Sequence, residues 1–180
     1  DWQDGNSDFR VRRYTANGAP VPGFGSGGNA DLAFDQGSSN DDVVTDLVVD
    51  ASDRIIVVGE VARSIAGDTD FGVAAFTAAG VLDASFGALG KRMIHFDLAA
   101  AAADDRDSAT AVSIGGDGRI AVAGTANVSE SEHGAAVAVL LGNGSDDSSF
   151  SSDAKAAVDF VGSFGDDESS TPRGVGFDSE

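Results

Sequence analysis

The sequence predicts an all-β protein built from repeated four-stranded antiparallel sheets. Three observations support this: one residue pattern recurs three times, its apolar side chains alternate with a period of two, and glycine-containing turns separate the alternating runs. The recurring positions lie 62 and then 64 residues apart. They are Asp8-Phe9, Tyr14, Asn17-Gly18 and Phe24-Gly25; Asp70-Phe71, Phe76, Ala79-Gly80 and Phe86-Gly87; and Ala135, Leu140, Asn143-Gly144 and Phe150.

The recurrence divides the chain into units of similar length. We place an N-terminal segment at residues 1–7, a first repeat at 8–69, a second at 70–133 and an incomplete third at 134–180. A repeat of this kind is one supersecondary unit whose apolar faces are buried by its neighbours. We therefore expect each complete repeat to form one sheet.

The first strand of each unit has the alternation of a β-strand. Phe9 and Val11 share one face, and Phe71 and Val73 share the same face in the second unit. The strand then stops at a turn such as Asn17-Gly18, whose residues accept the positive φ angles of a tight hairpin. A second strand follows with its own apolar pair: Leu32 and Phe34, Ile94 and Phe96, or Val158 and Phe160.

A third and a fourth strand follow as a hairpin in the first two units. Leu47 and Val49 of the third strand recur as Val112 and Ile114. The fourth strand, residues 55–59 in the first unit, is apolar on both faces, so both faces have to be covered. Four short strands per unit, stacked sheet against sheet, are the arrangement of a β-propeller blade. We predict a β-propeller-like array of two complete units and a truncated third.

Three strings of the second unit carry a family resemblance. They are DFGVA at 70–74, GVLDASFG at 80–87 and GDGRIAVAG at 116–124. On these strings the chain, over essentially residues 6–180, resembles the bacterial delta-60 repeat; the third unit departs from the pattern at Ala135 and Ser151. The resemblance implies a β-propeller repeat of large, mostly exported bacterial proteins of unassigned activity. It also implies an extracellular, periplasmic or cell-surface location.

The third unit ends with a counterpart of the third strand at 174–177. Propellers usually need about 4 to 8 blades to close. An isolated array of this length would leave apolar sheet faces and a strand edge uncovered. We expect either a segment of a longer array, which we prefer, or one protomer of a homo-oligomer that covers these faces by self-association.

The chain is strongly acidic: 30 Asp and Glu residues stand against 11 Lys and Arg, for a formal net charge of −19. Nucleic-acid binding needs clustered basic residues, and Arg10, Arg12 and Arg13 form only a local group, so we expect no nucleic-acid partner. No apolar run approaches the roughly 18 residues that cross a bilayer, so we expect no membrane insertion. The charge fits either solubility of an exported or salt-adapted protein, or binding of divalent cations.

Acidic residues gather in the loop before the third strand of every unit. Carboxylates are hard oxygen ligands of the kind that Ca²⁺ prefers, and backbone carbonyls can complete the shell. The alternative is that these residues form Asx-turns and bind loop amides. The chain has no cysteine, which excludes thiolate metal sites, and no cofactor other than Ca²⁺ is indicated. The candidate Ca²⁺ ligands are Asp41, Asp42, Asp104, Asp105, Asp107, Asp166 and Asp167.

Catalytic signals are weak. His95 stands where the other units have Ala33 and Asp159, which indicates a solvated, variable position. No serine lies in a G-x-S-x-G frame, and the glycine-rich run 23–28 lacks the lysine of a P-loop and matches the turn of the repeat. The sequence gives no catalytic residue.

Two classes of function remain. The first is a non-enzymatic extracellular scaffold whose rigid frame presents variable loops, notably 63–68 and 127–133, to a protein, a glycan or another copy. The second is a segment of a propeller-type hydrolase or lyase whose active site is completed by other blades. Titratable groups that converge at one end of the sheets would favour the second class.

Overall fold

The computed structural model describes residues 7–36, 41–64, 67–96, 98, 105–128, 133–158 and 171–178. These residues form strands, turns and extended segments, and none of them belongs to a helix that could cross a membrane. The strands are β1 (Phe9–Arg12), β2 (Asn29–Leu32), β3 (Asp42–Val49), β4 (Ile55–Ala62), β5 (Thr69–Phe76), β6 (Lys91–Ile94), β7 (Ser108–Ile114), β8 (Ile120–Asn127), β9 (His133–Leu140) and β10 (Lys155–Val158).

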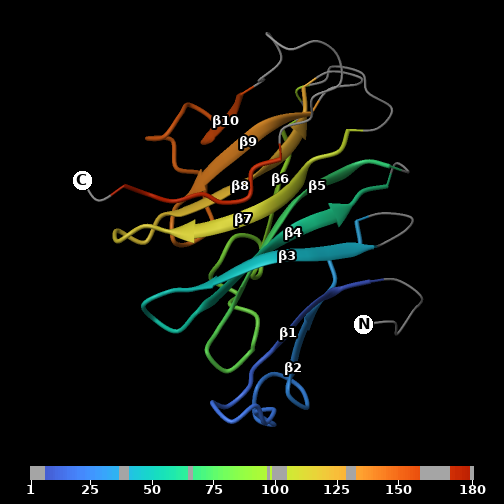
Figure 1. Ribbon diagram of the computed structural model, residues 1–180, viewed down its shortest axis with the longest axis vertical. Coiled ribbons are helices and arrows are strands. Elements are labelled where there is room, and N and C mark those ends of the chain that lie inside the picture. The colour runs from blue at the N-terminus through green and yellow to red at the C-terminus, as the bar shows by residue number, and fades with distance from the viewer. Residues whose placement is uncertain are drawn as a thin grey trace.

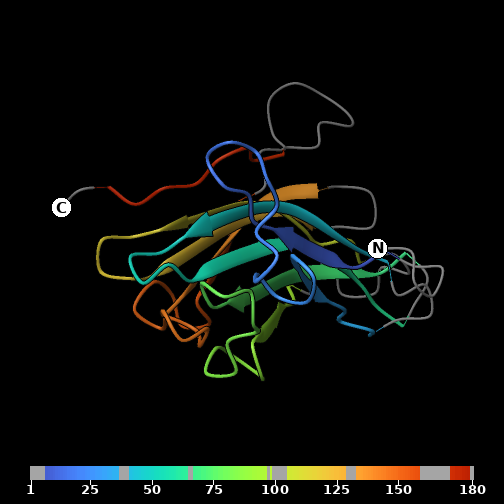
Figure 2. The same ribbon diagram turned by 90° about the horizontal axis from the view of Figure 1, so that it is seen from below.

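The strands build antiparallel sheets in which neighbours in sequence are neighbours in space. β1 and β2 form a two-stranded ribbon, while β3 to β6 and β7 to β10 each form a four-stranded sheet. In Figure 1 the ribbon β1–β2 lies at the bottom, β3 and β4 lie above it, and β9 and β10 lie at the top. Figure 2 looks from below past β1 onto the strands of the larger sheets. The predicted fold class, all-β with β-propeller-like four-stranded antiparallel blades, is confirmed.

The sheets are out of phase with the sequence repeats, which corrects the expectation that each repeat forms one sheet. β4 lies in the first repeat (8–69), yet it pairs with β5 of the second (70–133), with Val58 opposite Val73. The ribbon β1–β2 belongs to the first repeat but does not join β3 and β4 in one sheet. A short connection after β4 brings β5 back as its antiparallel neighbour, and short connections favour such pairing.

β4 is buried on both faces, as its composition predicts. Ile55 and Val57 join the apolar cluster that includes Phe9 of the ribbon. Ile56 and Val58 join the cluster that includes residues of β7 to β9. One strand therefore supplies both stacking interfaces of the first four-stranded sheet.

A phenylalanine ring of one sheet lies against a glycine of the next at both interfaces. A Cβ added to Gly59 of β4 would lie 3.0 Å from the Phe9 ring and 1.9 Å from the carbonyl oxygen of Val43. A Cβ added to Gly124 of β8 would lie 2.7 Å from the Phe71 ring and 2.0 Å from the carbonyl oxygen of Ser108. Because Phe9 and Phe71 are equivalent in the repeat, the same contact recurs one blade along.

A second contact between a phenylalanine and a glycine recurs at the turns that contain Phe24-Gly25 and Phe86-Gly87. The amide of Gly25 donates to the carbonyl oxygen of Ala79 at 2.7 Å, and the amide of Gly87 donates to that of Asn143 at 2.8 Å. The rings that precede these amides, Phe24 and Phe86, are fully buried and face the next turn's Gly80 and Gly144. The recurring Phe-Gly pair therefore links adjacent units.

Both lysines of the chain also link adjacent sheets. The Nζ of Lys91 donates to the carbonyl oxygen of Ala33 at 2.8 Å and lies 5.5 Å from the centre of the Phe34 ring. The Nζ of Lys155 makes the equivalent bond to the carbonyl oxygen of His95 at 2.7 Å. Such cations placed over aromatic rings add a stabilising electrostatic contact.

We predict that Gly124→Ala lowers the free energy of unfolding by about 1–3 kcal/mol or more, because the new methyl group would overlap a backbone carbonyl and the Phe71 ring. Urea denaturation measures the change. Gly116→Ala is the matched control, since nothing lies within 4 Å of its added Cβ; it should stay within about 1 kcal/mol of wild type. Equal stabilities of the two variants would contradict the stacking contact.

Candidate binding site

The first four-stranded sheet has an uncovered apolar face on the side of the ribbon. Leu47 and Val49 of β3 are 46% and 52% exposed. Their counterparts in β7 are Val112, which is 8% exposed, and Ile114, which packs partly buried against the core. The difference arises because β7 packs against Val48 of β3 and against β4 of the preceding sheet. The ribbon β1–β2, which lies on the equivalent side of β3 and β4, leaves Leu47 and Val49 uncovered.

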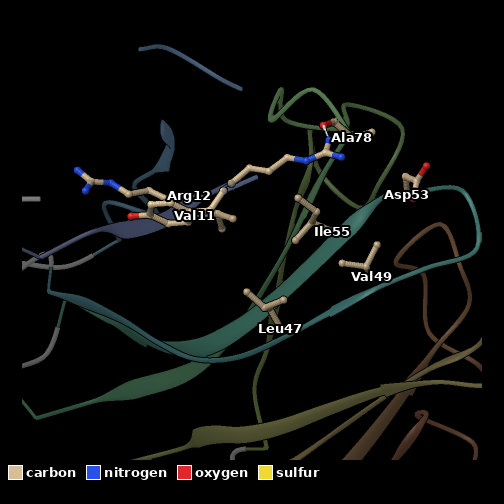
Figure 3. A pocket seen from close by; sticks show the side chains of 9 residues that line it. Val11, Arg12, Leu47, Val49, Asp53, Ile55 and Ala78 are labelled. Carbon is tan, nitrogen blue, oxygen red and sulfur yellow. Dashed lines mark hydrogen bonds between the residues drawn. The ribbon is translucent and has the colours of Figure 1, made fainter. Parts of the chain in front are cut away.

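A hollow of about 260 Å³ marks this uncovered face (Figure 3). The side chains of Leu47, Val49 and Ile55 rise from β3 and β4 beside Val11 of β1. The full lining is Val11, Arg12, Arg13, Tyr14, Leu47, Val49, Asp53, Ile55 and Ala78.

Two arginines and one aspartate, Arg12, Arg13 and Asp53, are among the residues that line the hollow. Arg12 donates from Nε to the side-chain oxygen of Asn29 at 2.6 Å, and Arg13 donates from Nη1 to the carbonyl oxygen of Ala78 at 3.0 Å. In the next blade the two arginines are replaced by Ala74 and Ala75, both fully buried. Of the local group of arginines noted in the sequence, Arg13 therefore reaches Ala78 at the hollow, whereas Arg10 and Arg12 lie on the face of the ribbon opposite Val11.

Two of the predicted calcium ligands, Asp42 and Asp107, are buried carboxyls that bind backbone amides. The Oδ2 of Asp42 accepts from the amide of Phe34, and the Oδ2 of Asp107 accepts from the amide of Phe96, both at 2.8 Å. Desolvation by burial is the main cause that raises the pKa of Asp42 to about 6 and that of Asp107 to about 7. The Asp42 carboxyl thus joins the segment after β2 to the start of β3, and the Asp107 carboxyl joins the segment after β6 to the start of β7.

The other predicted ligands are less closely engaged with the core. The Oδ1 of Asp41 accepts from the amide of Ser7 at 2.8 Å. Asp105 lies near Asp107, and its negative charge contributes to the raised pKa of that carboxyl. Asp104, Asp166 and Asp167 lie outside the described residues. Among the residues that are described, no three acidic or histidine side chains come together as a metal centre would require, and calcium binding stays a prediction.

An ionic cluster at the edge of the first four-stranded sheet could not be predicted from the repeat. The Nδ1 of His95 lies 2.6 Å from the Oδ2 of Asp70, and Arg63 contacts the same carboxylate. Asp70 is nearly buried, whereas the His95 side chain is 39% exposed. Asp70 recurs with the period, but His95 and Arg63 occupy variable positions, so only the fold brings the three together. The cluster fastens the strand ends beside the 63–68 loop.

The comparisons with known proteins agree with this architecture. Residues 51–86 match the model of a family described as a domain of unknown function (DUF5122) beta-propeller. The matched stretch contains β4 and β5, the strand pair that joins two sequence repeats into one sheet. No curated protein matches the chain. This part of the chain is thus similar to a β-propeller-type repeat, the class that the stacked four-stranded sheets define.

We predict that the free energy of unfolding falls as the pH rises from about 4 to about 7. The folded state holds the Asp107 proton more tightly than the ordinary pKa of 3.8 allows, so its contribution is fully present below 3.8 and is lost as the pH passes about 7. Asp42 acts in the same direction up to about pH 6. Carboxyls whose pKa is lowered by folding, such as Asp50, change the free energy of unfolding at pH values below their ordinary pKa of 3.8. They therefore do not contribute to the change between about pH 4 and about pH 7.

Urea denaturation of wild type and of Asp107→Asn across this pH range tests the prediction. A single such carboxyl contributes a slope of about 1.4 kcal/mol per pH unit within its window. The wild type should therefore lose stability more steeply than the variant. Parallel curves would mean that Asp107 is not buried as described.

Proposed function

We propose that this chain is a non-enzymatic, exported β-propeller-type scaffold of the delta-60 class that associates with other protein chains through its open sheet face. One observation carries the proposal: Leu47 and Val49 are about half exposed, whereas the equivalent residues of the second sheet are covered by another sheet. A contiguous apolar patch rimmed by polar residues is typical of a protein interaction site.

The residues around the patch support a protein ligand over a glycan. Tyr14, which is 53% exposed, and Arg13 are among the residues that line the hollow. Tyrosine and arginine are enriched in protein interfaces, where they surround an apolar centre. The exported location is supported by the delta-60 resemblance and by the acidic composition, which keeps such a protein soluble.

Self-association at high concentration tests this proposal. Sedimentation velocity of the wild type should show reversible association as the concentration rises, because an uncovered apolar face also contacts its own copies. The double variant Leu47→Asp/Val49→Asp should stay monomeric. Val81→Asp is the matched control, since Val81 is 60% exposed and lies outside the patch, and it should behave as wild type. Association that survives the double variant, or a wild type that is monomeric throughout, would contradict the proposed role of this face.

Calcium in the Asp-rich loops is a further part of the proposal. A ligand that binds only the folded state raises its stability by about 2.7 kcal/mol at a hundredfold excess over Kd. For a chain of this size that corresponds to a rise of roughly 5–10 °C in Tm. Calorimetry with Ca²⁺ and then with EDTA should show a reversible shift that Asp41→Asn and Asp105→Asn reduce. A Tm indifferent to both additions would exclude structural calcium.

A further inference from the structure

We propose that a second hollow, along β6, binds a small hydroxylated carboxylate of the sugar-acid class. This β6 groove lies between the end of β2, the turn at 85–88, β6 and the turn at 143–145. Its volume of about 640 Å³ is within the range of about 300–1,000 Å³ that small-ligand sites have. The inference goes beyond the proposed function, because the β6 groove shares no lining residue with the hollow beside Leu47 and Val49.

The lining of the β6 groove differs in charge from the rest of the chain. Asp and Glu make up 30 of the 180 residues, so twelve residues taken at random would include about two of them. None of the twelve described residues that line the groove is acidic, and three are basic: Lys91, Arg92 and His95. A concave site of this composition in an acidic chain favours an anionic ligand.

Two of these basic side chains are already paired with carboxylates. The Nη2 of Arg92 donates to both carboxylate oxygens of Asp146, at 2.7 and 2.8 Å. The Nδ1 of His95 lies 2.6 Å from the Oδ2 of Asp70. These two side chains therefore leave little uncompensated positive charge for a ligand.

Lys91 supplies the uncompensated charge of the β6 groove. Its Nζ donates to the carbonyl oxygen of Ala33 at 2.8 Å, and it forms no ion pair within the part of the chain that the structure describes. An ammonium group has three N–H donors, so two of them remain for a ligand. One unpaired cation matches a ligand with a single negative charge, such as a carboxylate.

Two serines that line the groove call for hydroxyl groups on the ligand. The Oγ of Ser85 donates to the Oδ1 of Asp83 at 2.6 Å, and the Oγ of Ser145 donates to the Oδ1 of Asn143 at 2.7 Å. A hydroxyl group has one proton to donate and two lone pairs that accept. Both serine oxygens are therefore acceptors for a ligand, and a ligand that satisfies them has to donate O–H groups.

Asn143 and Met93 complete the groove. The Oδ1 of Asn143 also accepts from the amide of Ser145 at 3.0 Å, so its Nδ2, which has no partner among the described residues, is a donor for a ligand oxygen. Met93 of β6 lines the groove and packs partly buried against the apolar cluster of the ribbon. The groove thus combines one free cation, donors and acceptors, and an apolar surface. A sugar ring with a carboxylate presents the complementary groups.

Sodium D-glucuronate is the probe that tests the proposal on the whole chain. We expect saturable binding in isothermal titration calorimetry. Glucose has the hydroxyl groups without the charge, and acetate has the charge without the hydroxyl groups, so each should bind at least about tenfold more weakly, which corresponds to about 1.4 kcal/mol. Inorganic phosphate, whose charge exceeds that of the single free lysine, should also bind more weakly.

The second lysine of the chain provides a matched control. Lys155 makes the equivalent bond to the carbonyl oxygen of His95 at 2.7 Å, but it does not line the groove. Lys91→Gln and Lys155→Gln therefore remove the same kind of contact between sheets, and only Lys91→Gln should weaken glucuronate binding at least about tenfold. Ser145→Ala keeps both lysines, and it should weaken the binding of glucuronate while leaving that of acetate unchanged.

Each contrary outcome overturns a stated part of the proposal. A wild type that shows no saturable binding of glucuronate in the millimolar range overturns it outright. Equal weakening by Lys91→Gln and Lys155→Gln means that the lysine acts through the packing of the sheets and not through a ligand. Acetate or phosphate that binds as tightly as glucuronate identifies a simple anion contact and overturns the sugar-acid class.

Discussion

The stacking of the sheets depends on a phenylalanine ring placed against a glycine of the next sheet. Phe9 meets Gly59, and Phe71 meets Gly124, at positions where a methyl group would also overlap a backbone carbonyl. The ring can lie this close only because the facing strand has no side chain there. The second contact, between Phe24 and Gly80 and between Phe86 and Gly144, repeats the same solution at the outer turns. Together these contacts set the spacing of adjacent blades.

The same contact also positions the ribbon β1–β2 on the first four-stranded sheet. The ribbon β1–β2 supplies the Phe9 ring, which lies against Gly59 of β4 and Gly72 of β5, and among the described strands it is a sheet of two. The inner part of the face, with Leu47 and Val49, is left uncovered. The outer face of the ribbon is polar, with Arg10 paired to Asp31 at 2.5 Å where the next blade has Gly72 and Met93. The ribbon thus combines an apolar face, which packs on the first four-stranded sheet, with a polar face on its opposite side.

Much of the fold follows from the sequence, because short stretches of residues are enough to indicate strands, turns and repeats. The alternation of Phe71 and Val73, the turn at Asn17-Gly18 and the two apolar faces of residues 55–59 all predict what the structure contains. The assignment of strands to sheets does not follow from the sequence. A repeating pattern does not show at which strand a sheet begins, and the pairing of β4 with β5 depends on the loop between them.

The candidate site was harder to predict. The alternating pattern of Leu47 and Val49 predicts core residues. Their exposure depends on which strands lie beside them, which the pattern does not show. The contact of His95 with Asp70 involves a position that varies between repeats, so periodicity gave no signal for it. The burial of Asp42 and Asp107 could not be predicted from the sequence either. Carboxyls that bind backbone amides and carboxyls that bind calcium occur in similar loop sequences.

Nuclear Overhauser contacts between ring and glycine protons test the central claim most directly. The account predicts cross-peaks from the Phe9 ring to the Hα protons of Gly59 and from the Phe71 ring to those of Gly124, together with cross-strand contacts between Val58 and Val73. Cross-strand contacts that instead join β2 to β3 within one sheet, with no ring-to-glycine contacts, would contradict it.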